Sequence, residues 1–256
     1  MLYHKIIKNS PDKEWVVMIH GAGGSMEAWY RQVPAYARHF NILLVDLVGC
    51  GKSQDISFTN NFSFECTAHQ VMEVVDYLKI EKCHLLGLSV GCIVARTISK
   101  LYPTRIKKVV LAGAITRLNI KMRILLSIAD TFKRIIPFQF LKWALVQFLI
   151  PQKRYRTSNH IAYRLSDTFG FQSFLQWMTL LNRIHDFLSE IFERPIDVPT
   201  LYMMGVDDLV FLKQAELTIK KNPHCNTLVV VPNAGHGCNI DNKDFFNKVS
   251  IEYLLA

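Results

Sequence analysis

The chain has 256 residues, half of them apolar and 20% charged, and carries a formal net charge of +9 at pH 7. This composition excludes a disordered tail or a low-complexity scaffold. The length favours one large domain with a full-sized core. The basic excess lies in one segment, residues 117–166, which contains ten Lys or Arg and one acidic residue, Asp130; the remainder of the chain is neutral. Because no zinc-ligand pairs and no basic region with heptads accompany this charge, we expect no nucleic-acid partner.

The cysteines and the N-terminal residues indicate a cytoplasmic protein. Six cysteines are scattered without a CxxC pair, which is typical of reduced thiols. Pro11 and two acidic residues come before any apolar run of signal-peptide length. The best candidate for a membrane span, residues 135–150, is interrupted by Lys142 and Gln147. We therefore expect that this segment does not cross a membrane, although it is able to lie on one.

Short apolar runs alternate with helical periodicity along most of the chain. The runs predict strands at Trp15–His20, Ile42–Asp46, Cys83–Leu88, Lys108–Leu111, Thr200–Met204 and Thr227–Val231. Near-continuous apolar strands separated by helices predict an α/β fold with a mostly parallel, doubly wound sheet. The alternation fails at residues 116–198, where helix-like segments predict a helical cap inserted into a core made of residues 1–115 and 199–256.

A serine lies on a predicted strand-to-helix turn. Gly87-Leu88-Ser89-Val90-Gly91 follows one predicted strand and precedes the helical run Cys92–Lys100. Such a turn needs small flanking residues, because the backbone is strained and neighbouring elements approach closely. It would expose the Ser89 hydroxyl and place the Val90 amide at a helix N-terminus, where it can stabilise an oxyanion.

A glycine-rich loop follows the first predicted strand. His20-Gly21-Ala22-Gly23-Gly24 is suited to supply a second oxyanion donor, the backbone N–H of Ala22. The alternative is a dinucleotide-binding turn. The G-x-G-x-x-G spacing of such a turn is not met here, so we predict no dinucleotide cofactor.

A serine hydroxyl needs a base to remove its proton and a carboxylate to hold that base. Candidates follow the last two predicted strands, in Gly205-Val206-Asp207-Asp208 and Asn233-Ala234-Gly235-His236-Gly237. The order along the chain is therefore serine, aspartate, histidine. Either Asp207 or Asp208 satisfies this requirement.

These motifs together resemble the α/β-hydrolase fold family, in the subset with a helical cap inserted after the sixth strand, over nearly the whole chain. The resemblance implies that Asp208, three residues after a strand-ending glycine, is the acid, with Asp207 as the fallback, and that His236 is the base. Residues 46–53 (DLVGCGKS) resemble the family's D-x-x-G-x-G-x-S loop. A phosphate-binding loop would require glycine at position 46, so we interpret Asp46 as structural.

The resemblance implies a capped serine hydrolase of the esterase or lipase type, with Ser89, Asp208 and His236 as the catalytic residues. We expect cleavage of a carboxylic ester or thioester, with a small-molecule apolar acyl or aryl ester as the substrate. Cleavage of a carbon–carbon bond beside a ketone and a receptor role with little turnover are the alternatives. We expect no cofactor and no metal, because no pair of histidines shares a helical face. Gly237 stands where many relatives carry an aromatic residue, which predicts a wider pocket beside His236.

The predicted cap is aromatic and basic. It holds 13 of the 29 aromatic residues of the chain, which either pack on one another or line an apolar pocket above Ser89. We expect the basic residues to form its solvated face. Basic and apolar residues alternate between Ile120 and Ile150, which favours contact with an anionic membrane. The same charge would equally attract an anionic substrate or an acidic protein.

Overall fold

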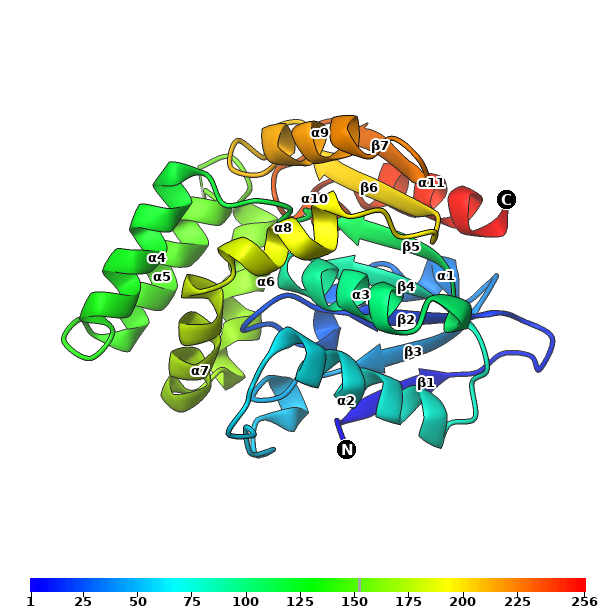
Figure 1. Cartoon of the computed structure of the whole chain (residues 1–256), viewed down its shortest axis with the longest axis horizontal. Helices are drawn as coiled ribbons and strands as arrows, with labels where there is room; N and C mark the ends of the chain where they lie inside the picture. Colours follow the sequence, from blue (N-terminus) through cyan, green and yellow to red (C-terminus); the bar gives the residue numbers. More distant parts are fainter. Residues whose placement is uncertain (152) are drawn as a thin grey trace.

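The computed structural model describes residues 1–151 and 153–256, which form a seven-stranded sheet with helices on both faces (Figure 1). The strands are β1 (His4–Ile7), β2 (Trp15–Ile19), β3 (Asn41–Val45), β4 (Cys83–Leu88), β5 (Ile106–Ala112), β6 (Thr200–Gly205) and β7 (Asn226–Val231). Their order is β1-β3-β2-β4-β5-β6-β7. Only β1 is antiparallel to its neighbour, so the predicted mostly parallel α/β fold is confirmed.

Helices connect the parallel strands and cover the sheet. The α-helices are α1 (Val33–Tyr36), α2 (Phe64–Tyr77), α3 (Val90–Leu101), α4 (Ile120–Phe132), α5 (Phe138–Leu149), α6 (Arg156–Leu165), α7 (Phe171–Asn182), α8 (His185–Glu193), α9 (Leu212–Lys221), α10 (Cys238–Asp241) and α11 (Lys243–Leu255). Short 3₁₀ turns are η1 (Met26–Trp29), η2 (Gly51–Ser53), η3 (Pro103–Arg105) and η4 (Ser166–Thr168).

The central strands are buried on both faces, which explains their continuous apolar runs. Val17 and Ile19 of β2 belong to the core formed with α2 and α3. Val16 and Met18 of the same strand belong to the core formed with α1 and α11. Successive side chains of a strand point to opposite faces. A strand with two packed faces therefore needs an apolar residue at every position.

The sequence analysis missed β1, and the reason lies in its position. It is an edge strand whose central residues, Lys5 and Ile6, are exposed, so its sequence shows neither a continuous apolar run nor a clear alternation. Even with β1 counted, the helical insertion follows the fifth strand, not the sixth that the resemblance implies. The N-terminal part of this sheet has one strand fewer than that pattern requires.

Five helices, α4 to α8, occupy the chain between β5 and β6. The helices α4 to α7 lie at one end of the sheet, whereas α8 runs back beside α3 (Figure 1). The five helices span 120–193 and lie within the predicted insertion. Trp177 of α7 anchors them to the core, because its indole N–H donates to the carbonyl oxygen of Val48, 3.1 Å away. Within the described residues, no helix is both long and apolar enough to cross a membrane.

The helix α3 approaches β2 unusually closely at Gly91. A Cβ atom at this position would lie 2.3 Å from the carbonyl oxygen of Ile19. That distance is far below any van der Waals contact, and the obstacle is backbone that cannot rotate away. Glycine at position 91 therefore sets the depth at which α3 sits on the sheet.

We expect Gly91→Ala to destabilise the fold by about 3 kcal/mol or more, because the new methyl group must displace either α3 or β2. Gly170→Ala is the matched control. No atom lies within 4 Å of the corresponding Cβ position at Gly170, and the loss there should stay below about 1 kcal/mol. Urea unfolding of the two variants measures the difference. Equal stabilities would contradict this explanation of Gly91.

Candidate active site

Ser89 sits on a strained turn between β4 and α3. Its backbone has φ 55° and ψ −116°, a conformation that L-residues rarely adopt. The turn is held by hydrogen bonds on both sides: the Ser89 N–H donates to Ala112, and the Ser89 carbonyl accepts from Cys92. The strained backbone presents the Ser89 side chain at the carboxyl end of the sheet, where α/β proteins place their ligands.

His236 and Asp208 complete a hydrogen-bonded relay with Ser89. The His236 Nε2 atom lies 3.0 Å from the Ser89 Oγ atom, and the His236 Nδ1 atom lies 2.8 Å from Asp208 Oδ2. A carboxylate only accepts hydrogen bonds, so Nδ1 carries the proton and Nε2 is free to accept one from the serine. Both His236 and Asp208 are buried. The second oxygen of Asp208 accepts the N–H of Phe211, which fixes the carboxylate.

The neighbouring Asp207 points to the cap. Its carboxylate accepts a hydrogen bond from the Tyr155 hydroxyl and pairs with Arg154, 2.7 Å away. The ring of Tyr155 also packs against Gly235, one residue before His236. Of the two aspartates that the sequence leaves open, Asp208 contacts the histidine, while Asp207 ties the cap to the adjacent loops.

Two backbone amides face the same cavity as Ser89. Ala22 and Val90 line it together with the serine. Among the described residues, neither amide donates a hydrogen bond. Val90 is buried, whereas Ala22 is exposed. Both N–H groups are available to a negatively charged oxygen beside Ser89.

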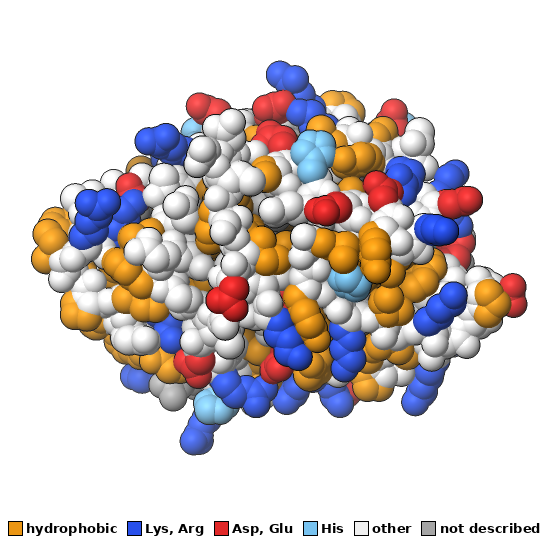
Figure 2. All heavy atoms as spheres, turned by 90° about the horizontal axis from the view of Figure 1, so that it is seen from below, with side chains coloured by type: hydrophobic (Ala, Val, Ile, Leu, Met, Phe, Trp, Pro, Cys, Tyr) orange, Lys and Arg blue, Asp and Glu red, His pale blue; other side chains and the backbone are white. Residues whose placement is uncertain are grey.

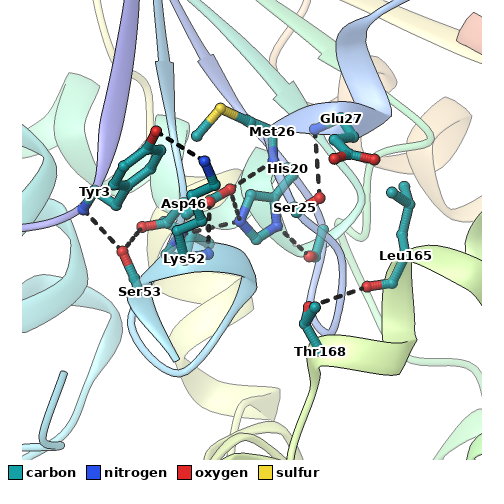
Figure 3. A network of polar contacts seen from close by, with 12 residues as sticks. Tyr3, His20, Ser25, Met26, Glu27, Asp46, Lys52, Ser53, Leu165 and Thr168 are labelled. Carbon is teal, nitrogen blue, oxygen red and sulfur yellow. Dashed lines mark hydrogen bonds and ion pairs between the residues drawn. The ribbon is translucent and has the colours of Figure 1, made fainter. Parts of the chain in front are cut away.

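His20 holds the loop that carries Ala22 (Figure 3). Its Nε2 atom accepts the N–H of Leu47 at 3.0 Å, so its Nδ1 atom must carry the proton donated to the Gly21 carbonyl, 2.7 Å away. Burial lowers the pKa of His20 below its usual value, although the nearby Asp46 opposes this shift. Sequence analysis treated His20 only as the end of a strand. Its place directly before a glycine-rich loop is the signal for this role.

Asp46 joins the two loops beside the site (Figure 3). Its carboxylate accepts the N–H of Met26 at 2.7 Å and the N–H of Lys52 at 2.9 Å. Gly51 has a positive φ, and a Cβ atom there would lie 2.4 Å from an Asp46 oxygen. The backbone of Gly51 and Lys52 thus packs directly against the Asp46 carboxylate. This geometry confirms the structural interpretation of Asp46.

Ser89 opens onto two apolar cavities under the cap. The first, about 170 Å³, is lined by residues such as Met122, Leu126 and Leu145 of the cap. The second, about 150 Å³, is lined by His236 together with Ile161 and other residues. An apolar cavity of about 150 Å³ holds a benzene ring. The site therefore offers two adjoining small apolar chambers that both reach Ser89, named here the first and the second chamber.

The second chamber differs from the wide pocket that Gly237 predicts. A Cβ atom at Gly237 would lie 3.1 Å from the Cβ atom of Ser158, and Ile150 is also within contact distance. The α6 helix of the cap therefore packs closely over Gly237. The absence of an aromatic side chain at position 237 makes room for the cap as well as for a ligand.

The basic residues of the cap are not all solvated, contrary to expectation. Lys142 is buried and lines the first chamber, with its Nζ atom 3.3 Å from Asp167 and 4.8 Å from the centre of the Tyr163 ring. Four further cations of residues 117–166 have a carboxylate within 4.0 Å: Arg117, Lys133, Arg154 and Arg164. Charge counted along the sequence therefore overstates the charge that this segment presents to solvent.

Other polar residues near the site have structural contacts. Asp241 accepts the N–H of Gly235, so it shapes the loop that carries His236. Cys92 and Cys238 are buried, and burial raises the pKa of both thiols. They pack beside the site as neutral groups, as expected. Within the described part of the chain, no group of three or more His, Cys, Asp or Glu residues is placed to hold a metal ion.

Comparison with known proteins agrees with this arrangement. A family model described as alpha/beta hydrolase fold matches residues 14–243. A relative from Stutzerimonas stutzeri strain A1501, provisionally named as the carbamate hydrolase RutD, is 24% identical, with 95% of this chain and 92% of the relative covered. The 2-hydroxy-6-oxo-6-(2'-aminophenyl)hexa-2,4-dienoic acid hydrolase of Metapseudomonas resinovorans is 22% identical over 93% of this chain and 83% of its own.

A solved structure shows the same fold. The enol-lactonase from Burkholderia xenovorans LB400 superposes with a TM-score of 0.83 and is 20% identical, with 100% of this chain and 96% of the lactonase covered. At this level of identity the likeness concerns the arrangement of the elements. The details of the site come from the geometry of this chain.

The buried, neutral His20 predicts how stability depends on pH. Because its pKa in the fold is lowered, the unfolded chain binds a proton below pH of about 6.5 while the folded chain resists it. The contribution of the neutral His20 to the free energy of unfolding should therefore be fully present above about pH 6.5. It should decrease as the pH falls below about 6.5, by up to about 1.4 kcal/mol per pH unit for each such histidine.

Urea unfolding at several pH values measures this slope. His84 is also buried with a lowered pKa, caused mainly by burial, and contributes in the same direction. The His20→Asn variant, whose amide does not titrate, should show a shallower slope. An unchanged slope in that variant, or stability that increases on acidification, would contradict the assignment.

Proposed function

Since the chain belongs to the alpha/beta hydrolase fold family, we propose that it is a serine hydrolase that cleaves a carboxylic ester or thioester. The observation that carries this proposal is the hydrogen-bonded relay of Ser89, His236 and Asp208 at the junction of two apolar chambers. The serine, the base and the orienting carboxylate are each within hydrogen-bonding distance of the next group.

The geometry supports an acyl-enzyme mechanism. His236 Nε2 takes the hydroxyl proton as Ser89 Oγ attacks the substrate carbonyl. The Ala22 and Val90 amides stabilise the oxyanion that forms, and Asp208 stabilises the imidazolium. His236 then returns the proton to the leaving oxygen or sulfur as its bond to the carbonyl carbon breaks. A water molecule, deprotonated by His236, then attacks the acyl carbonyl, and His236 returns the proton to Ser89 Oγ as the bond between Oγ and the acyl carbon breaks and the acid leaves.

We assign each of the two chambers to one part of the substrate. His236 delivers the proton to the leaving group, so the second chamber, which His236 lines, accommodates the alcohol or thiol part. The first chamber then accommodates the acyl part beside the oxyanion amides. Both chambers are lined mainly by apolar side chains. A small ester or thioester fits this arrangement when its acyl part and its alcohol or thiol part are both apolar.

Carbon–carbon bond hydrolysis is the second candidate, because the relative from Metapseudomonas resinovorans is named for a dienoic acid carrying a 6-oxo group. The same relay would serve, with His236 protonating a carbon leaving group. Ester cleavage asks less of the leaving group, because an alkoxide or thiolate is a weaker base than a carbanion. The alternative outside enzymes is a receptor of the same fold with little turnover.

A fluorophosphonate probe and a series of p-nitrophenyl esters of increasing acyl length test the proposal. We expect the probe to label the wild type and not Ser89→Ala, and kcat to fall by about four orders of magnitude or more in that variant. Labelling with negligible ester turnover would favour the receptor. Turnover of a 6-oxo-dienoic acid without ester turnover would favour carbon–carbon hydrolysis.

The adjacent aspartates provide a matched pair of variants. Asp208→Asn should lower kcat by about four orders of magnitude, because the histidine loses its orienting carboxylate. Asp207→Asn removes the same charge one residue away and should lower kcat less than about tenfold, since its contacts are with the cap. Comparable losses in the two variants would contradict the assignment of Asp208.

The division of the substrate is tested by enlarging one chamber at a time. Leu145 lines only the first chamber and Ile161 only the second, and both are half-buried cap residues. Leu145→Ala should raise kcat/KM for longer acyl chains by about tenfold per accommodated methylene pair, with the alcohol preference unchanged. Ile161→Ala should do the reverse. If both variants changed the same preference, the two-chamber assignment would be wrong.

A further inference from the structure

The α4 helix exposes a stripe of large apolar side chains. Ile120, Ile124, Ile128 and Phe132 are four residues apart, so they share one side of the helix. Their exposed fractions lie between 43% and 66%. Its other side carries Met122, Leu126 and Ala129, which are buried in the cap. The helix is therefore apolar on both sides, although only one side is packed.

The stripe leads to the tip of the hairpin formed by α4 and α5. Ile135, in the turn between the helices, is the most exposed of these residues at 77%. Phe140 and Trp143 follow in the first two turns of α5, both exposed and with their ring centres 5.7 Å apart. The outer cap face, as named here, consists of Ile120, Ile124, Ile128, Phe132, Ile135, Phe140 and Trp143.

The hairpin projects at the end of the molecule farthest from the C-terminus (Figure 1). Figure 2 shows hydrophobic side chains gathered at this end, with Lys and Arg side chains beside them. A soluble monomer rarely exposes so many large apolar residues together without a binding role. A partner is therefore needed to cover the outer cap face.

The charges beside the outer cap face decide which partner fits. Lys121, Arg123 and Arg134 are exposed and have no carboxylate within 4.0 Å among residues 1–151 and 153–256. The one acidic residue of the hairpin, Asp130, is already paired with Lys133. A second copy of this chain would bring like charges together across the contact. An anionic surface would neutralise them.

We propose that the outer cap face docks on an anionic lipid bilayer. Ile, Phe and Trp side chains of the hairpin enter the boundary between headgroups and acyl chains, while the three unpaired cations contact the headgroups. The Trp143 ring has the amphipathic character that favours this boundary. This inference concerns a surface separate from the relay of Ser89, and binding requires no catalysis.

Docking would bring the bilayer close to the first chamber. Met122 and Leu126 of α4 line that chamber from the side opposite the exposed stripe. The bilayer surface and the chamber are then separated by about one helix diameter, roughly 10 Å. An apolar ester dissolved in the bilayer would have a short path to the cap.

Flotation of the full chain with vesicles measures docking directly, without any substrate. The anionic vesicles contain phosphatidylcholine with about one phosphatidylglycerol in three lipids, which gives a strong negative surface potential. At low salt we expect binding to these vesicles and weak binding to vesicles of pure phosphatidylcholine. Binding should weaken as salt rises. Tryptophan emission should shift to the blue and be quenched by brominated lipid tails, and Trp143→Phe should remove this change. Of the other tryptophans, Trp29 and Trp177 are buried and Trp15 is half-buried at the start of β2.

Two double variants separate the apolar and the charged contributions. Lys121→Gln with Arg123→Gln should weaken binding to anionic vesicles by about 30-fold, from roughly 1 kcal/mol per cation. Ile124→Ser with Ile128→Ser should weaken it by about tenfold or more. The matched control is Lys213→Gln with Leu217→Ser on α9, which replaces one exposed cation and one exposed apolar residue on another side of the molecule and should bind as the wild type does.

Activity towards a short, soluble p-nitrophenyl ester should be the same in all these variants, so loss of docking is distinguishable from loss of the proposed catalysis. Absence of salt-sensitive vesicle binding would overturn the proposal. Equal loss in the α9 control would also overturn it. A wild-type dimer in sedimentation equilibrium that Ile124→Ser with Ile128→Ser dissociates would assign the outer cap face to a second copy.

Discussion

The close contact between α3 and β2 at Gly91 is the constraint on which the site depends. Glycine lets the helix backbone approach the Ile19 carbonyl, close to the turn at Ser89, whose φ is 55° and ψ is −116°. The same approach sets the Val90 amide beside the glycine-rich loop that follows β2. Ser89 and the backbone amides of Ala22 and Val90 are therefore positioned by backbone packing. The strain at Ser89 is offset by the buried contacts of α3 with the sheet.

Around this contact, hydrogen bonds from two buried residues fix the loops that side-chain packing alone would leave adjustable. His20 ties the loop after β2 to the chain after β3. Asp46 does the same from the opposite direction, through Met26 and Lys52. Each bond satisfies an amide or carbonyl that burial would otherwise leave unpaired. The loop that carries Ala22 is thus held in place by hydrogen bonds from both residues.

The cap contributes both the walls of the site and an outer surface. Contacts from Trp177 and Tyr155 hold it on the core, while its helix α4 is apolar on its inner and outer sides. The inner side makes a chamber for an apolar group, and the outer side remains uncovered. The cap therefore lines an apolar chamber with one side of α4 and exposes large apolar residues on the other side.

Local patterns in the sequence determined the parallel sheet, the strand-to-helix turn at Ser89 and the order of serine, aspartate and histidine. Each of these features depends on neighbouring residues, whose periodicity or turn chemistry is visible along the chain. Tertiary structure showed which carboxylate reaches His236: the residue pattern left Asp207 and Asp208 open, the family resemblance favoured Asp208, and the fold directs Asp208 to His236 and Asp207 to the cap. It also decided that Lys142 is buried while Arg134 is exposed. Burial and pairing depend on residues far apart in the sequence, so a count of charges along the chain does not contain them.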